Sequence, residues 1–130
     1  MEAADPSGIE VSIVVSEPWE FEVEHGARPL RARVERVGAD YWAPERGAVL
    51  IRLLAPIAFQ GVRCEYFIAT PRHENGDVRC LAGGSPLDCN LVRIPPDRAT
   101  SRAPFDLGWW RGGTAMIGTL QKRPGPASLP

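Results

Sequence analysis

Glycine and proline interrupt this chain so often that little room is left for helices of ordinary length. The 130 residues include 13 glycines and 13 prolines, and both residue types are unfavourable inside a helix. No window of ten or more residues shows apolar side chains at the spacing of an amphipathic helix. The sequence therefore predicts short extended strands joined by turns.

Apolar and polar residues alternate most clearly near the amino-terminal end, in the pattern of half-buried strands. The alternating segments are residues 9–15, 19–24 and 30–35. In the second segment Trp19, Phe21 and Val23 would point into the core, while the glutamates between them would face water.

The second and third of these segments are expected to pair as a hairpin, with glutamates of one strand facing arginines of the other. One register sets Glu22 opposite Arg31 and Glu20 opposite Arg33, whereas a shift by two residues sets Glu24 opposite Arg31. Each such pair contributes roughly 0.2–1 kcal/mol. Either register predicts that the charged faces of the two strands meet.

Further strands are expected along the rest of the chain. A second hairpin joins residues 48–54 to 62–69, and single strands follow at 78–82, 87–94 and about 114–120. The pair Asn75-Gly76 is a strong hairpin-turn signal. If 78–82 pairs with 87–94, Cys80 falls opposite Cys89 on the core side, where free cysteines act as small apolar side chains.

These segments predict an all-β fold. About eight short strands without helical connections favour a small antiparallel barrel, SH3-like or OB-like in general architecture, and a two-sheet β-sandwich is the alternative. Residues 1–122 are expected to form a single β domain. Residues 123–130, rich in proline, are expected to form a flexible tail.

Composition and charge exclude several classes. Apolar residues make up 44% and charged residues 24%, which is typical of a globular protein. The net charge of −1 provides no general attraction for nucleic acids or membrane surfaces. The acidic start has no apolar signal region, no apolar run could span a bilayer, and the three cysteines do not suggest a disulfide framework. A cytoplasmic location is therefore expected.

No catalytic, cofactor or metal signature is found. The candidates for a metal site, Cys64, His73, Cys80 and Cys89, lack the close spacing of metal-binding motifs. No nucleophile elbow, phosphate loop or dinucleotide fingerprint occurs. His25 and His73 are isolated in predicted turns.

Neighbouring aromatic residues are the better indication of a function. In an extended segment Trp109 and Trp110 point to opposite faces, so one of them is expected near the surface beside Arg111. Exposed tryptophan and arginine are typical of binding hot spots. Tyr41 and Trp42 lie in a proline-containing loop and form a second candidate binding segment.

The segment 108–112 resembles the Trp-Trp segment of SH3 domains, whose first tryptophan lines a groove for proline-rich peptides. The resemblance is confined to those five residues. The chain has neither the Ala-Leu-Tyr-Asp-Tyr-like start nor the Pro-x-x-Tyr element of that family, so the family is not assigned.

Three functional hypotheses follow. The favoured one is a non-enzymatic interaction domain that binds a protein or a small ligand. The alternative is a nucleic-acid-binding barrel, which clustering of Arg63, Arg79, Arg93 and Arg111 on one surface would support. A hydrolase or isomerase with an acidic site is the third hypothesis, which a deep pocket with two or more carboxyl groups, at least one with a raised pKa, would support.

Overall fold

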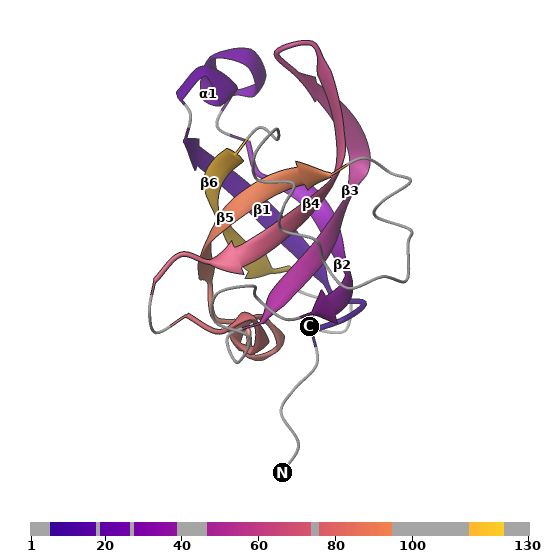
Figure 1. Ribbon diagram of the computed structural model, residues 1–130, viewed down its shortest axis with the longest axis vertical. Helices are drawn as coiled ribbons and strands as arrows, with labels where there is room; N and C mark the ends of the chain where they lie inside the picture. The colour runs from indigo at the N-terminus through magenta and orange to yellow at the C-terminus, as the bar shows by residue number, and fades with distance from the viewer. Residues whose placement is uncertain are drawn as a thin grey trace, which may run out of the picture.

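The strands form a closed barrel. The computed structural model describes residues 6–17, 19–26, 28–38, 47–73, 76–94 and 115–123. Within these residues six antiparallel strands follow one another around the barrel, and the last strand returns to pair with the first (Figure 1). The strands are β1 (Glu10–Glu17), β2 (Leu30–Gly38), β3 (Ala48–Phe59), β4 (Val62–Pro71), β5 (Leu87–Ile94) and β6 (Ala115–Lys122). The prediction of a small antiparallel all-β barrel is confirmed, and the two-sheet alternative is wrong because closure joins all strands into one sheet.

Alternate side chains from every strand fill the interior of the barrel. Val11, Ile13, Val34 and Ile51 are at most 1% exposed. The same core includes Ala32, Val49, Leu53, Phe67, Ala69, Leu87, Cys89, Leu91, Met116 and Leu120. Residues 9–15 and 30–35 therefore alternate between apolar and polar because every second side chain points into this interior.

Strands β3 to β5 are buried on the outer side as well. Leu50 and Ile68 alternate with inward-facing neighbours, yet both are buried in a second apolar cluster outside the barrel interior. Its other members are Ala48, Tyr66 and Ile94. Burial on both sides explains why this part of the sequence is almost continuously apolar.

The segment predicted as the second alternating strand is a helix. Residues Trp19–His25 form α1, which lies at one end of the barrel (Figure 1). The predicted hairpin between 19–24 and 30–35 is therefore wrong, because β2 pairs with β1. Arg33 lies opposite Glu10, and the guanidinium of Arg31 donates to the Glu10 carboxylate at 2.5 Å. The arginines of β2 do face a glutamate, but it comes from β1.

The strand predicted at 78–82 is also wrong. Residues Val78–Gly83 form a 3-10 helix, η2, at the end of the barrel opposite α1 (Figure 1). The Asp77 carboxylate caps this helix by accepting a hydrogen bond from the backbone N–H of Arg79 at 2.9 Å. These two helices account for the difference between six described strands and the expected eight.

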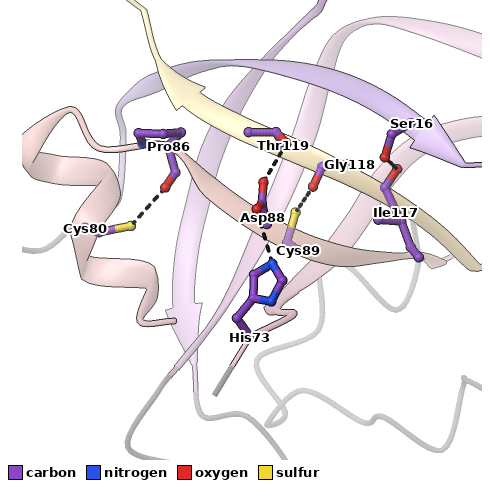
Figure 2. Close-up of polar contacts among 9 residues, drawn as sticks. All are labelled: Ser16, His73, Cys80, Pro86, Asp88, Cys89, Ile117, Gly118 and Thr119. Carbon is purple, nitrogen blue, oxygen red and sulfur yellow. Dashed lines mark hydrogen bonds and ion pairs between the residues drawn. The ribbon is translucent and has the colours of Figure 1, made fainter. Parts of the chain in front are cut away.

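The cysteines do not face one another across a strand pair. The Cys80 thiol lies on η2 and points toward the carbonyl oxygen of Pro86, whereas the Cys89 thiol, inside the barrel, points toward that of Gly118 (Figure 2). Both are free thiols, as is Cys64. The predicted pairing of Cys80 with Cys89 fails because residue 80 is helical.

The other predicted strands agree with the structure. The hairpin from 48–54 to 62–69 is the β3–β4 pair, and the segment 87–94 coincides with β5. Among the residues that the structure describes, no helix has the length and the apolar character needed to cross a bilayer. The predicted tail lies outside the described residues from position 124 onward.

Candidate functional site

The binding residues predicted from sequence lie outside the described residues. They are Tyr41, Trp42, Trp109, Trp110 and Arg111. Their role in binding stays a prediction. The described residues instead offer two surfaces that sequence reasoning missed, one on α1 and one on the wall formed by β2 to β4.

One side of α1 closes this end of the barrel. Successive helical residues are about 100° apart, so Phe21 and His25, four positions apart, lie on the same side. Phe21 is 3% exposed, and its ring packs against Phe59, with the ring centroids 5.1 Å apart. The His25 ring lies 4.8 Å from that of Phe21. Phe21 thus plugs the mouth of the barrel.

Two hydrogen bonds hold α1 against the tip of the β3–β4 hairpin. The Nε2 of His25 lies 2.6 Å from the Ala58 carbonyl oxygen, which can only accept, so this nitrogen donates. The backbone N–H of Gln60 donates to the Glu24 carboxylate at 3.2 Å. The helix is therefore fixed in orientation, and its opposite side faces water.

That opposite side carries two large apolar side chains. Trp19 and Val23 are four positions apart, so they adjoin each other on the helix surface. Trp19 is 69% exposed and Val23 is 71% exposed. We call this pair the α1 ridge. The prediction that both residues lie in the core is wrong, because a helix turns them away from Phe21 whereas a strand would not.

Carboxylates surround the α1 ridge. Glu22 is exposed on its outer side, and Glu20 and Glu24 lie one above the other along its flank. Glu17, at the end of β1, is also exposed. The ridge is thus a pair of apolar side chains flanked by carboxylates. Such a surface favours a partner that has basic side chains around an apolar surface.

Three arginines form a second surface on the outside of β2 to β4, which we call the arginine face. Its members are Arg33, Arg52 and Arg63. Arg33 lies directly opposite Arg52 in the β2–β3 pair. Arg93 lies opposite the core residue Phe67 and so belongs to the inward-facing positions of β5, from which its Nε donates to the carbonyl oxygen of Arg63 at 2.6 Å.

Carboxylates adjoin each arginine of this surface. Glu65 accepts from Arg52 at 3.3 Å and lies 3.5 Å from a guanidinium nitrogen of Arg63. The Arg52 guanidinium also lies over the Tyr66 ring, 5.7 Å from its centroid. Glu10 lies directly opposite Arg33 in the β1–β2 pair.

The arginines named for nucleic-acid binding do not all gather here. Arg63 belongs to the arginine face, but Arg93 is on the inward side of β5, and Arg79 lies on η2 at the other end of the barrel, where it pairs with Asp77. Arg111 is outside the described residues. The alternative hypothesis therefore keeps one of its four arginines on this surface, joined by Arg33 and Arg52.

His73, just beyond β4, Asp88 of β5 and Thr119 of β6 form a polar chain that resembles part of a catalytic arrangement (Figure 2). The Nε2 of His73 lies 3.2 Å from one Asp88 carboxylate oxygen, and the Thr119 hydroxyl donates to the other at 2.8 Å. The hydrogen bond from Thr119 is the main cause that lowers the pKa of Asp88, and the contact with His73 lowers it further. The Thr119 hydroxyl donates its hydrogen to Asp88, so it is not the activated nucleophile that such an arrangement needs.

The shifted pKa values do not favour acid–base or thiol catalysis. The Asp77 carboxyl also has a lowered pKa, because Arg79 donates to it, whereas a general acid needs a raised one. Burial raises the pKa of the Cys89 thiol to about 12 and also raises those of Cys64 and Cys80. These thiols therefore stay protonated at neutral pH and are poor nucleophiles.

The described residues hold no group of three or more histidine, cysteine, aspartate or glutamate side chains placed to bind a metal ion. Comparisons with known proteins give the chain no family, since no protein-family model, no curated protein and no solved structure matches it. The α1 ridge and the arginine face are therefore the strongest candidates for function.

Proposed function

We propose that this chain is a non-enzymatic interaction domain and that the α1 ridge contacts a protein partner. The observation that carries the proposal is the exposure of Trp19 and Val23, at 69% and 71%, on a helix whose other side is fixed to the barrel. Phe21 plugs the barrel mouth from the other side of α1, so neither exposed side chain is needed to close it.

A large exposed side chain of this kind suits a binding hot spot. Tryptophan is among the residues most enriched at such positions, where truncation to alanine typically costs about 2 kcal/mol or more. Two hydrogen bonds from α1 to the β3–β4 hairpin support the proposal further, because they present the ridge in one orientation before binding. Preorganisation lowers the entropy cost of association.

The aromatic segments predicted from sequence are retained as a second part of this proposal. We expect Trp109, Trp110 and Arg111, together with Tyr41 and Trp42, to contribute to binding, as their residue types suggest. We also place the interaction in the cytoplasm. The three free cysteines support that location, since a reducing compartment keeps thiols unpaired.

The test is a pull-down from an extract of the source cells with wild-type protein, Trp19→Ala and Val14→Ala as immobilised baits. Val14 is 45% exposed on β1, so its truncation is a matched control for the loss of an exposed apolar side chain. Trp19→Ala should keep the free energy of unfolding within about 0.5 kcal/mol of wild type. We expect proteins enriched by wild type and by Val14→Ala to be lost with Trp19→Ala. Equal capture by all three baits, or no capture by any, would contradict the proposal.

A second candidate function is nucleic-acid binding through the arginine face. The exposed guanidinium groups of Arg52 and Arg63, with Arg33 opposite Arg52, favour it, because guanidinium groups bind phosphates. Retention on single-stranded DNA should then weaken steeply with salt, and Arg63→Ala should reduce both the affinity and the salt dependence. Absence of retention at low salt would exclude this function.

A further inference from the structure

The tip of the β3–β4 hairpin extends beyond the strands on either side of it. The described pairs of β3 with β2 end at Leu53, and those of β4 with β5 end at Tyr66. Among the described strands, residues 54–59 and 62–65 therefore have no neighbour outside their own hairpin. Figure 1 shows the tip reaching past the end of β5. Each edge of the tip is thus a place where a further strand could pair.

The turn at this tip determines which backbone groups point to the two edges. Residues 60–61 both have a positive φ, 51° and 79°, as a two-residue type I′ turn requires. The flanking pair, Phe59 with Val62, then exchanges hydrogen bonds inside the hairpin. The backbone N–H and C=O groups of the next pair, Ala58 with Arg63, therefore point outward, one residue to each edge.

Both outward carbonyl groups accept a hydrogen bond from a side chain of a neighbouring element. On the β3 edge, the Nε2 of His25 in α1 donates to the Ala58 carbonyl oxygen at 2.6 Å. On the β4 edge, the Nε of Arg93 in β5 donates to the Arg63 carbonyl oxygen, also at 2.6 Å. We call His25 and Arg93 the edge caps. A strand added to either edge would need these carbonyl oxygens as acceptors, so each cap occupies a group that strand addition requires.

Prolines end the strands that would otherwise cover these edges. Pro29 directly precedes β2, and Pro95 and Pro96 directly follow β5 in the sequence. Proline has no backbone N–H, so neither strand could be prolonged along the tip with a full set of donors. Side chains from α1 and β5 supply the donors instead.

We propose that the edge caps are autoinhibitory contacts, which prevent a second copy of this chain from pairing with the hairpin tip. An open sheet edge is a template for another strand, and a second copy carries the same edge, as a two-fold symmetric pair requires. Two other features of the tip act in the same direction. Pro56 lies in the part of β3 beyond Leu53, and the charged side chain of Arg63 is 69% exposed on β4.

Sedimentation velocity of the full chain from micromolar to millimolar concentrations tests the cap on β4. We expect the wild-type protein to be monomeric and Arg93→Met, which keeps a long side chain without the donor, to self-associate. Its dissociation constant should be at least roughly tenfold lower, the factor that corresponds to one hydrogen bond from a charged donor. Arg31→Met removes the same charge from β2, where Arg31 donates to Glu10, and should remain monomeric.

His25→Phe tests the cap on β3. Phenylalanine keeps an aromatic ring next to Phe21 and removes the hydrogen bond to the Ala58 carbonyl oxygen. This variant should also self-associate, and combining it with Arg93→Met should strengthen the association, because the two caps act at different edges. Neither cap belongs to the α1 ridge, so this test is independent of the proposed function.

A proline at each edge identifies the surface through which the variants associate. The N–H groups of residues 58 and 63 point outward, so a proline there removes an edge donor and keeps the hydrogen bonds within the hairpin. Arg63→Pro should restore the monomer in the Arg93→Met background, and Ala58→Pro should restore it in the His25→Phe background. Association caused by general unfolding would not be reversed in this way.

Two results would overturn the proposal. One is that Arg93→Met and His25→Phe associate no more than the wild-type protein does. The other is that they associate equally with and without the edge prolines, because the contact would then lie outside the hairpin tip.

Discussion

The two ends of the barrel are closed in the same way but present different surfaces to water. At one end α1 inserts Phe21 against Phe59, and at the other η2 inserts Val78 and Leu81, which are at most 1% exposed. The outer side of α1 carries the exposed apolar ridge. On the outer side of η2, Arg79 is paired with the Asp77 carboxylate.

This difference separates what closes the barrel from what is available for binding. A short helix with one or two buried apolar residues is enough to close an end, as η2 shows. Trp19 and Val23 add exposed apolar area that closure does not require, and such area on a small protein is a sign of an interaction surface. The comparison predicts that stability and binding depend on different residues of α1.

The largest expected effects come from removing the buried plugs. Phe21→Ala should lower the free energy of unfolding by about 3–5 kcal/mol, and Leu81→Ala by about 2–5 kcal/mol, because each leaves a cavity in the core. Urea denaturation measures both. If Phe21→Ala costs no more than the truncation of an exposed residue, α1 does not close the barrel and the comparison fails.

Thiol labelling shows whether each plug acts at its own end. Cys64 contacts the backbone at Phe59 and Val62 near α1, whereas Cys80 lies on η2. Phe21→Ala should accelerate the labelling of Cys64, while Leu81→Ala should accelerate that of Cys80. Equal acceleration of both thiols by either variant would mean that the barrel opens as a whole.

A pair of glycines sharpens the comparison of the two ends. Gly47 has a φ of +78°, and a Cβ added there would lie 2.6 Å from a methyl carbon of Val78, whereas Gly26, after α1, has a φ of +77° and open space around it. Gly26→Ala should therefore cost only the left-handed backbone conformation, about 1–2 kcal/mol.

Gly47→Ala adds the contact with Val78, whose branched side chain has little freedom to move. Overpacking of this kind costs a further 1–3 kcal/mol or so, giving about 2–5 kcal/mol in total. Thermal and urea denaturation of both variants measure the difference. Equal losses for Gly26→Ala and Gly47→Ala would show that the η2 end yields without strain.

Most strands were predictable because each one is marked by a pattern of apolar residues within its own segment. Residues 87–94 match β5, and the hairpin at 48–54 and 62–69 matches β3 and β4, since apolar runs and alternation reflect burial on the barrel wall. Closure of the barrel by β1 and β6 joins segments about a hundred residues apart. No local pattern specifies such a pairing.

Both helices were missed because, in a segment of six or seven residues, the spacing of apolar side chains does not distinguish a helix from a strand. Phe21 is buried whether residues 19–25 are extended or helical, but Trp19 and Val23 join it in the core only if they are extended. The signals for a helix were present: glutamates in its first turn, His25 in its last turn and Gly26 after it. The exposed ridge could have been predicted from them.

The signal for η2 was Asp77 as a cap before residues 78–83. The arginine face was harder to predict, because Arg33, Arg52 and Arg63 come together only through the pairing of β2, β3 and β4. Sequence reasoning named Arg63 and Arg93 but grouped them with Arg79, which the fold places at the opposite end.

The smallest expected effect concerns the ion pair that caps the η2 end. The hydrogen bond from Arg79 holds the pKa of the Asp77 carboxyl below its ordinary value of 3.8. A carboxyl with a lowered pKa in the folded state stabilises the fold above its ordinary pKa, and this contribution is lost as the pH falls through the lowered value. Asparagine caps a helix as well as aspartate does, so Asp77→Asn removes the charge and keeps the cap.

Asp77→Asn should therefore be slightly less stable than wild type at pH 7, and the difference should shrink as the pH falls below 3.8. Urea denaturation at pH 7 and pH 3 measures it, and the effect is small because an exposed pair is screened by solvent. In an Arg79→Ala background the same substitution should have little effect at either pH. If Asp77→Asn still lowers the stability in the Arg79→Ala background, the Arg79 side chain is not the cause. The outer side of η2 would then have another charged contact with Asp77.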